Sequence, residues 1–138
     1  MDLITYQKDA LRTLGLPPIL DNREGQMNLA ALGFSGEAGE FTDLVKKVLF
    51  HGKPLDGETR DRLLKEIGDL LWYAAVAADS LDSNLSEIAE ANLAKLRIRY
   101  LEGFTFKDSA ERRDVTDPKD GDEPPGIFNR AREGDRGH

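Results

Sequence analysis

Residues 36–47 read GEAGEFTDLVKK and place Glu37 and Glu40 three positions apart. On a helix, this spacing puts two side chains on one face, about one turn from each other. A second pair has the same spacing, because Glu66 and Asp69 lie three apart in KEIGDLLWYAAVAA. The sequence therefore predicts two helices that each present a pair of carboxylates.

Apolar residues recur at helical spacing through most of the chain, and glycine or proline stands at the breaks. They predict an all-α protein with helices at residues 2–14, 26–50, 58–80 and 86–103. Ser86 is the expected N-cap of the last helix. The composition changes after Phe106, so we expect a helical domain over residues 1–106 and a charged, irregular C-terminal tail over 107–138. Ile127 and Phe128 are the expected anchors of this tail.

Charge and composition narrow the function classes. The 138 residues fit one domain, and the net charge of -7 argues against binding to a nucleic-acid polymer. The absence of cysteine excludes disulfides, thiolate chemistry and cysteine-based metal sites. A secretion signal and a long apolar run are both missing, so a cytoplasmic protein without a membrane partner is expected.

The surroundings of the second pair favour a role beyond solubility. Leucine, isoleucine and alanine lie on most sides of the helix around Glu66 and Asp69, which predicts that both carboxylates face inward. Buried carboxylates without a cation are very costly. The alternative is that each pair is a solvated helix face. Glu37, Glu40, Glu66 and Asp69 would together form an all-oxygen cage suited to Mg²⁺ or Mn²⁺.

Three glycines beside the carboxylates support the cage: Gly36, Gly39 and Gly68. Each costs about 1 kcal/mol relative to alanine inside a helix. We expect close approach of helix backbones around the cage to offset this cost. A redox di-iron bundle is not expected, because the only histidines are His51, in a predicted loop, and the terminal His138.

Cations and an amide follow the carboxylates in positions where they could meet phosphates. Lys95 lies three after Asn92, so the two share a helix face and could hold a nucleotide's sugar or phosphate. Lys47 and Arg99 are further candidates. For Lys47 the alternative is a surface ion pair with Asp43, four positions earlier.

The order and spacing of these motifs resemble a known family. Glu37-x-x-Glu40, Glu66-x-x-Asp69, Asn92-x-x-Lys95 and RYLEGF are similar to the MazG-like all-α nucleoside triphosphate pyrophosphohydrolases over about residues 26–106. The resemblance implies a four-helix-bundle-type fold that assembles as a homodimer or a homotetramer. It also implies cleavage of a nucleoside triphosphate into the monophosphate and pyrophosphate, with two or more Mg²⁺ or Mn²⁺ ions per site.

Carried over by position, the resemblance makes the four carboxylates metal ligands and makes Asn92 and Lys95 substrate contacts. We expect Glu37 to accept a proton from the attacking water, and Lys95, with Lys47 or Arg99, to stabilise the leaving pyrophosphate. Trp72 could stack on the nucleobase or belong to the core.

Deoxynucleoside triphosphates are the expected substrates, and a purine such as dGTP is a trial choice that no residue pattern supports. Two other functions stay open at this point. The chain could be a non-catalytic helical interaction module, or a metal-dependent phosphohydrolase that cleaves a different phosphate bond.

Overall fold

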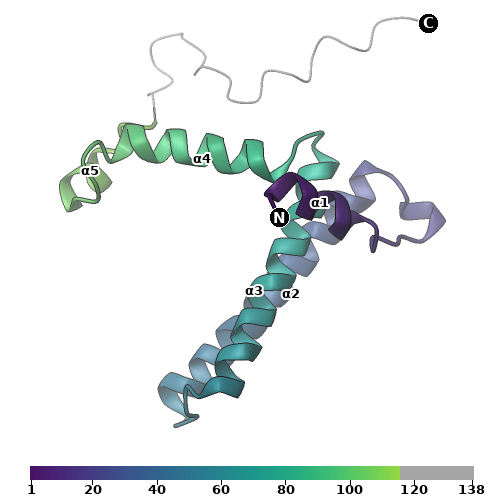
Figure 1. Ribbon diagram of the computed structural model, residues 1–138, viewed down its shortest axis with the longest axis horizontal. Helices are drawn as coiled ribbons and strands as arrows, with labels where there is room; N and C mark the ends of the chain where they lie inside the picture. The colour runs from purple at the N-terminus through teal and green to yellow at the C-terminus, as the bar shows by residue number, and fades with distance from the viewer. Residues whose placement is uncertain (116–138) are drawn as a thin grey trace, which may run out of the picture. The chain divides into compact units, whose positions relative to one another are not determined.

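The computed structural model describes residues 1–115, and within them it contains helices and loops but no strand (Figure 1). The all-α class is therefore confirmed. The predicted tail anchors Ile127 and Phe128 lie outside the described residues. The chain forms two compact units, Met1–Ser86 and a second that starts at Glu87. The predicted boundary between residues 106 and 107 stays a prediction.

The first unit is built around two long helices. They are α2 (Arg23–Phe50) and α3 (Gly57–Ser80), which lie side by side as a hairpin (Figure 1). A shorter helix, α1 (Leu3–Leu11), packs against α3, and a 3₁₀ turn, η1 (Pro18–Leu20), leads into α2. No helix within residues 1–115 is long and apolar enough to cross a bilayer.

Side chains placed just before the helices explain where these begin. A side-chain oxygen accepts a hydrogen bond from the backbone N–H three residues later, which satisfies a donor that the helix itself leaves unpaired. The capping residues are Asp2 for α1, Asn22 for α2, Asp56 for α3 and Thr105 for α5 (Phe106–Glu111). The predicted helices at residues 2–14, 26–50 and 58–80 thus exist, with starts moved by up to three residues and the first one ending at Leu11.

The last predicted helix begins differently from the expectation. Helix α4 spans Leu85–Arg99, so Ser86 is not its N-cap and the helix ends four residues before Gly103. The N–H of Leu85 donates to the side chain of Gln7 instead, at 2.8 Å. Local sequence could not predict a contact with a residue so far along the chain.

The core of the first unit is small. It is centred on Ala75, Ala78 and Leu85, and Tyr6 and Ala10 of α1 pack against it. Alanine at these positions lets the short α1 lie close to α3. Leu44, on the inner side of α2, is also buried.

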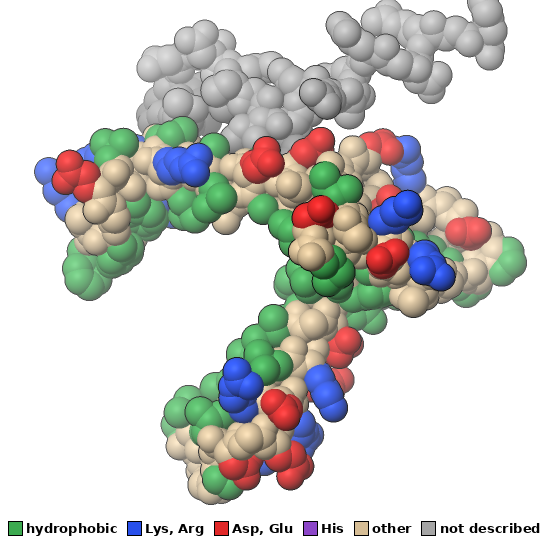
Figure 2. Space-filling view, in the orientation of Figure 1, with side chains coloured by type: hydrophobic (Ala, Val, Ile, Leu, Met, Phe, Trp, Pro, Cys, Tyr) green, Lys and Arg blue, Asp and Glu red, His purple; other side chains and the backbone are tan. Residues whose placement is uncertain are grey.

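Part of the apolar face of the α2–α3 hairpin is exposed in the single chain. Leu32 is 76% exposed and Leu49 67%, whereas Leu44 is 3% exposed. Ile67, beside Glu66, is 49% exposed, so the prediction that α3 is buried on most sides there is wrong for one chain. Figure 2 shows apolar side chains reaching the surface along the α2–α3 hairpin. Periodicity identifies an apolar face but does not say what covers it.

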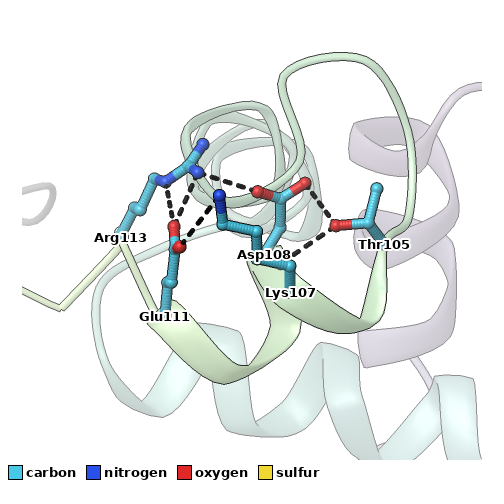
Figure 3. A network of polar contacts seen from close by, with 5 residues as sticks. All are labelled: Thr105, Lys107, Asp108, Glu111 and Arg113. Atoms are coloured by element: carbon cyan, nitrogen blue, oxygen red, sulfur yellow. Dashed lines mark hydrogen bonds and ion pairs between the residues drawn. The ribbon is translucent and has the colours of Figure 1, made fainter.

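The described part of the second unit holds most of α4 together with α5. Helix α5 carries a local polar network in which Arg113 binds Asp108 and Glu111, at 3.0 and 2.6 Å (Figure 3). The prediction of an irregular tail is therefore wrong at its beginning, because residues 107–111 are helical. Thr105 caps this helix, and the turn before it uses Gly103 at φ +103°, a conformation that favours glycine.

Candidate metal centre

Three of the four predicted ligands lie together on the α2–α3 hairpin. Glu37 and Glu40 come from α2, and Glu66 comes from α3. Each offers a carboxylate oxygen, and these oxygens lie within 4.8 Å of one another. We call these three residues the acidic cluster. The helical spacing of three places the first two on one face, and the hairpin brings the third alongside them.

The neighbouring carboxylates affect the ionisation of Glu37. The pKa of Glu37 is raised above its ordinary value, first by the desolvation of its carboxyl group and then by the negative charges of Glu40, Asp69 and Glu66. Like charges this close disfavour ionisation of one another. A divalent cation bound between the carboxylates would relieve the repulsion.

The donor set fits a hard divalent cation. Carboxylate oxygens are the ligands that Mg²⁺ and Mn²⁺ prefer, and protein sites for Mg²⁺ commonly supply few carboxylates, with water and substrate phosphates as the remaining ligands. A group of three partly exposed carboxylates leaves room for such ligands.

Asp69 lies at the edge of the site. It is exposed and is not one of the three grouped residues, but its charge acts on Glu37 and on Tyr6 of α1. The pKa of Tyr6 is raised, mainly by burial and then by Asp69. Asp69 therefore shares the local field of the acidic cluster, and its role as a fourth ligand stays a prediction.

The comparisons with known proteins bear on this geometry. Residues 26–104, which hold all four carboxylates and the whole of α4, match the MazG nucleotide pyrophosphohydrolase domain. The chain belongs to the MazG family. This match confirms the family that the sequence motifs indicated.

One relative is similar to more than half of this chain. The chain is 42% identical over 83 residues to the "Gene 37 protein" of Mycobacterium phage L5, a stretch that covers 57% of this chain and 69% of that protein. No solved structure matches the chain. The MazG domain implies a nucleotide pyrophosphohydrolase, an enzyme that acts on nucleotides.

The three glycines beside the carboxylates are not the sites of close backbone approach that the sequence analysis predicted. A Cβ atom at Gly36, Gly39 or Gly68 would meet nothing within 4 Å, so no backbone approaches them in the single chain. Close approach occurs instead at Gly33, where a Cβ would collide with the ring of Tyr73. Sequence alone could not separate Gly33 from its neighbours, because the relevant contact comes from the other helix of the hairpin.

Trp72 is held by α1. Its indole N–H donates to the carbonyl of Ala10 at 3.2 Å and to the hydroxyl of Thr13 at 2.8 Å, and its ring meets Tyr73 edge to face with centroids 4.9 Å apart. These contacts favour the structural alternative for Trp72. Stacking of Trp72 on a nucleobase stays a prediction.

Lys47, a predicted phosphate contact, is ion-paired with a neighbour on α2. The Nζ atom of Lys47 lies 2.5 Å from a carboxylate oxygen of Asp43, which is the surface ion pair considered as the alternative for Lys47. The Nζ atom of Lys46 lies 2.6 Å from the other oxygen of the same carboxylate. The two lysines lower the pKa of Asp43 to about 2. Lys47 thus shares one carboxylate with Lys46 in this structure.

The remaining candidates lie in the second unit, on α4. Asn92 and Lys95 are both exposed and share a face of the helix. Arg99 forms two hydrogen bonds with Asp114, at 2.6 and 2.5 Å, and Asp114 is almost fully buried. Sequence reasoning missed Asp114, which is one acidic residue among many in a charged segment.

Proposed function

We propose that this MazG protein is a divalent-metal-dependent enzyme that hydrolyses nucleoside triphosphates to the nucleoside monophosphate and pyrophosphate. The observation that carries the proposal is the acidic cluster, because Glu37, Glu40 and Glu66 lie within 4.8 Å of one another inside a MazG domain. Solvated surface carboxylates gain nothing from such closeness, whereas ligands of a shared cation do.

The acidic cluster would hold Mg²⁺ or Mn²⁺, with Asp69 as the fourth ligand and two or more ions in each site. When bound, such ions neutralise phosphate charge and lower the pKa of water, so that water attacks near neutral pH. The chain's own residues would then orient the triphosphate and manage the proton. Glu37 is our choice for the group that accepts the proton from water, because desolvation and the neighbouring carboxylates raise its pKa above the ordinary value.

Binding of the nucleotide is assigned to α4. Asn92 would hold the sugar or a phosphate, and Lys95, one turn later, would stabilise negative charge on the leaving pyrophosphate. Lys95 is preferred over Lys47 and Arg99, since those two are paired with Asp43 and Asp114. Deoxynucleoside triphosphates are the proposed substrates, and dGTP is the first to test. We place the protein in the cytoplasm.

The exposed apolar face of the α2–α3 hairpin supports assembly with a second copy of the chain. Phe50 is 79% exposed, and Leu32, Leu49 and Ile67 are also exposed. Soluble proteins rarely leave so many large apolar side chains on one element. Pairing of two hairpins would give the four-helix-bundle-type arrangement, in a homodimer or a dimer of dimers, and would bury the residues around Glu66.

The experiment is product analysis by ion-exchange chromatography for a panel of nucleoside and deoxynucleoside triphosphates, with Mg²⁺, with Mn²⁺ and with chelator. Glu40→Gln removes a ligand of the cluster, and Glu24→Gln, an exposed position at the start of α2, is the matched control. Monophosphate and pyrophosphate should appear only with metal, and only with the wild type and the control. Release of orthophosphate would show that another bond breaks, and no turnover would favour a binding module.

A further inference from the structure

Tyr73 of α3 lies directly against the backbone of α2. One edge of its ring fills the space that a Cβ atom would take at Gly33, so a larger residue at Gly33 would have to displace the ring or the helix. Both residues are half-buried. The proposed reaction uses neither of them, although both lie within the first unit, as the acidic cluster does.

The contact between Tyr73 and Gly33 lies next to the carboxylates. Helices α2 and α3 run in opposite directions in the hairpin (Figure 1), so a step forward along α2 matches a step back along α3. Glu37 lies four residues after Gly33, and Asp69 lies four residues before Tyr73. Both are therefore on the contacting faces, about one turn or about 6 Å from the contact. The charge of Asp69 contributes to the raised pKa of Glu37, which agrees with this placement.

On the other side of the contact the hairpin is closely packed. Ala30, three residues before Gly33, is 3% exposed, and Val76, three residues after Tyr73, is fully buried. Asp69, one turn in the other direction, is exposed. Gly33 and Tyr73 thus stand at the border between the apolar part of the hairpin and its charged part.

The ring of Tyr73 is itself restrained. Trp72 meets it edge to face, with the ring planes at 89°. The indole N–H of Trp72 donates to Ala10 and Thr13, so the C-terminal end of α1 holds Trp72 in place. Aromatic pairs with this geometry contribute about 0.5–1.5 kcal/mol beyond the burial of their surface. A ring with these neighbours resists displacement.

The carboxylates beside this contact repel one another. Oxygens of Glu37, Glu40 and Glu66 lie within 4.8 Å of each other, and without a cation their repulsion favours separation of the side chains and of the helices. A rigid contact one turn away opposes this separation. Ligands that are held in place before binding give a higher affinity, because less conformational freedom is lost when the ion binds.

We infer that Tyr73 is a positioning residue, whose ring, seated on the backbone at Gly33, holds α2 and α3 at the separation that the acidic cluster needs to bind a divalent cation. The inference rests on the proposed function for the cation. Residues that orient the ligands of a metal without touching it commonly contribute about 10–100-fold to metal affinity.

The test measures the affinity of the full chain for Mn²⁺ without nucleotide, by electron paramagnetic resonance of the free ion. Tyr73→Leu removes the ring, and Tyr73→Phe keeps it. Val76→Ala is the matched control, because it truncates a fully buried side chain one layer further from the carboxylates and so lowers stability without changing the contact at Gly33. Thermal unfolding of each variant is followed by circular dichroism, and affinities are compared below the onset of unfolding.

Tyr73→Leu should raise Kd for Mn²⁺ about tenfold or more. Tyr73→Phe should bind Mn²⁺ as the wild type does, and so should Val76→Ala, although its melting temperature falls. Gly33→Ala tests the same contact from α2 and should also weaken binding, since its Cβ displaces the ring. Combined with Tyr73→Leu it should add little, because the ring is already absent.

Unchanged Mn²⁺ affinity in Tyr73→Leu would overturn the inference and leave the proposed metal site in place. An equal loss in Val76→Ala would overturn it as well, because Tyr73 would then be a general structural residue. A loss in Tyr73→Phe as large as in Tyr73→Leu would assign the effect to the hydroxyl group and contradict positioning by the ring. A wild type that binds no Mn²⁺ would instead overturn the proposed metal site, and the inference with it.

Discussion

Glu37 on α2 and Glu66 on α3 bring carboxylate oxygens within 4.8 Å of each other across the hairpin. Two negative charges at this separation repel each other, and a cation bound between them would relieve the repulsion. Under the proposed function the same pair links stability to metal binding, and this link can be measured without any substrate.

The first prediction concerns metal and stability. Mn²⁺ or Mg²⁺ should raise the melting temperature of the wild type. At a metal concentration one hundred times Kd, the free energy of unfolding should increase by about 2.7 kcal/mol. Glu66→Gln removes one charge, so the metal-free variant should be as stable as the wild type or more so, and its response to metal should be lost. Thermal unfolding followed by circular dichroism checks both, with Glu24→Gln as the control. A variant that keeps the full metal response would remove Glu66 from the site.

The second prediction follows from the raised pKa of Glu37. In the folded, metal-free protein this carboxyl group holds its proton more tightly than in the unfolded chain, so the folded state binds more protons in the interval between the two pKa values. Stability should therefore rise as the pH falls through the folded pKa toward the ordinary value near 4.5. Metal affinity should fall over the same interval, because the ligand must lose its proton to bind.

Melting temperatures measured across this pH interval, with and without Mn²⁺, test the predicted directions of the changes in stability and in metal affinity. Glu37→Gln should flatten the metal-free pH profile. Metal affinity that stays constant as the pH falls would contradict the assignment of Glu37 as a ligand.

The third prediction concerns Gly33. Alanine at this position would place a Cβ into the ring of Tyr73, so Gly33→Ala should destabilise the protein by about 1–3 kcal/mol. Gly68→Ala is the matched control, since its Cβ meets nothing within the chain and alanine favours a helix by about 1 kcal/mol. Urea unfolding gives both values. Equal effects of the two substitutions would mean that Tyr73 does not pack against α2 as the structure shows.

The fourth prediction separates the two roles of Trp72. Trp72→Phe keeps an aromatic ring but removes the N–H that binds Ala10 and Thr13, so stability should fall by about 1 kcal/mol. KM for the nucleotide should change little. Unchanged stability with a raised KM would instead support contact with the base.

The fifth prediction concerns the exposed apolar face of the hairpin. Ile67→Glu should lower the mass seen by sedimentation to that of one chain, because a charge on this face opposes pairing of two hairpins. Leu81→Glu is the control, since Leu81 is also exposed but lies at the end of α3. A wild type that is already a monomer would contradict the proposed assembly.

The sequence predicted the features that depend on local spacing. Helical periodicity, with glycine and proline at the breaks, located the first three helices to within a few residues. The pairs at spacing three located the carboxylates, and the order of the motifs identified the family.

Features that depend on contacts between distant residues were missed. The N–H of the first residue of α4 is bound by Gln7 of α1, and the close contact at Gly33 comes from the ring of Tyr73 on α3. Burial around Ile67 was overestimated, because an apolar face predicts a cover without saying whether the same chain supplies it. The partner of Arg99 could not be chosen among the many acidic residues that follow it.

The most direct test of the central claim is turnover in water labelled with heavy oxygen, with both products weighed by mass spectrometry. The account predicts equal amounts of nucleoside monophosphate and pyrophosphate, with the label on the monophosphate, only when Mg²⁺ or Mn²⁺ is present, and not with Glu40→Gln. Orthophosphate with a nucleoside diphosphate, or turnover that chelator leaves unchanged, would contradict it.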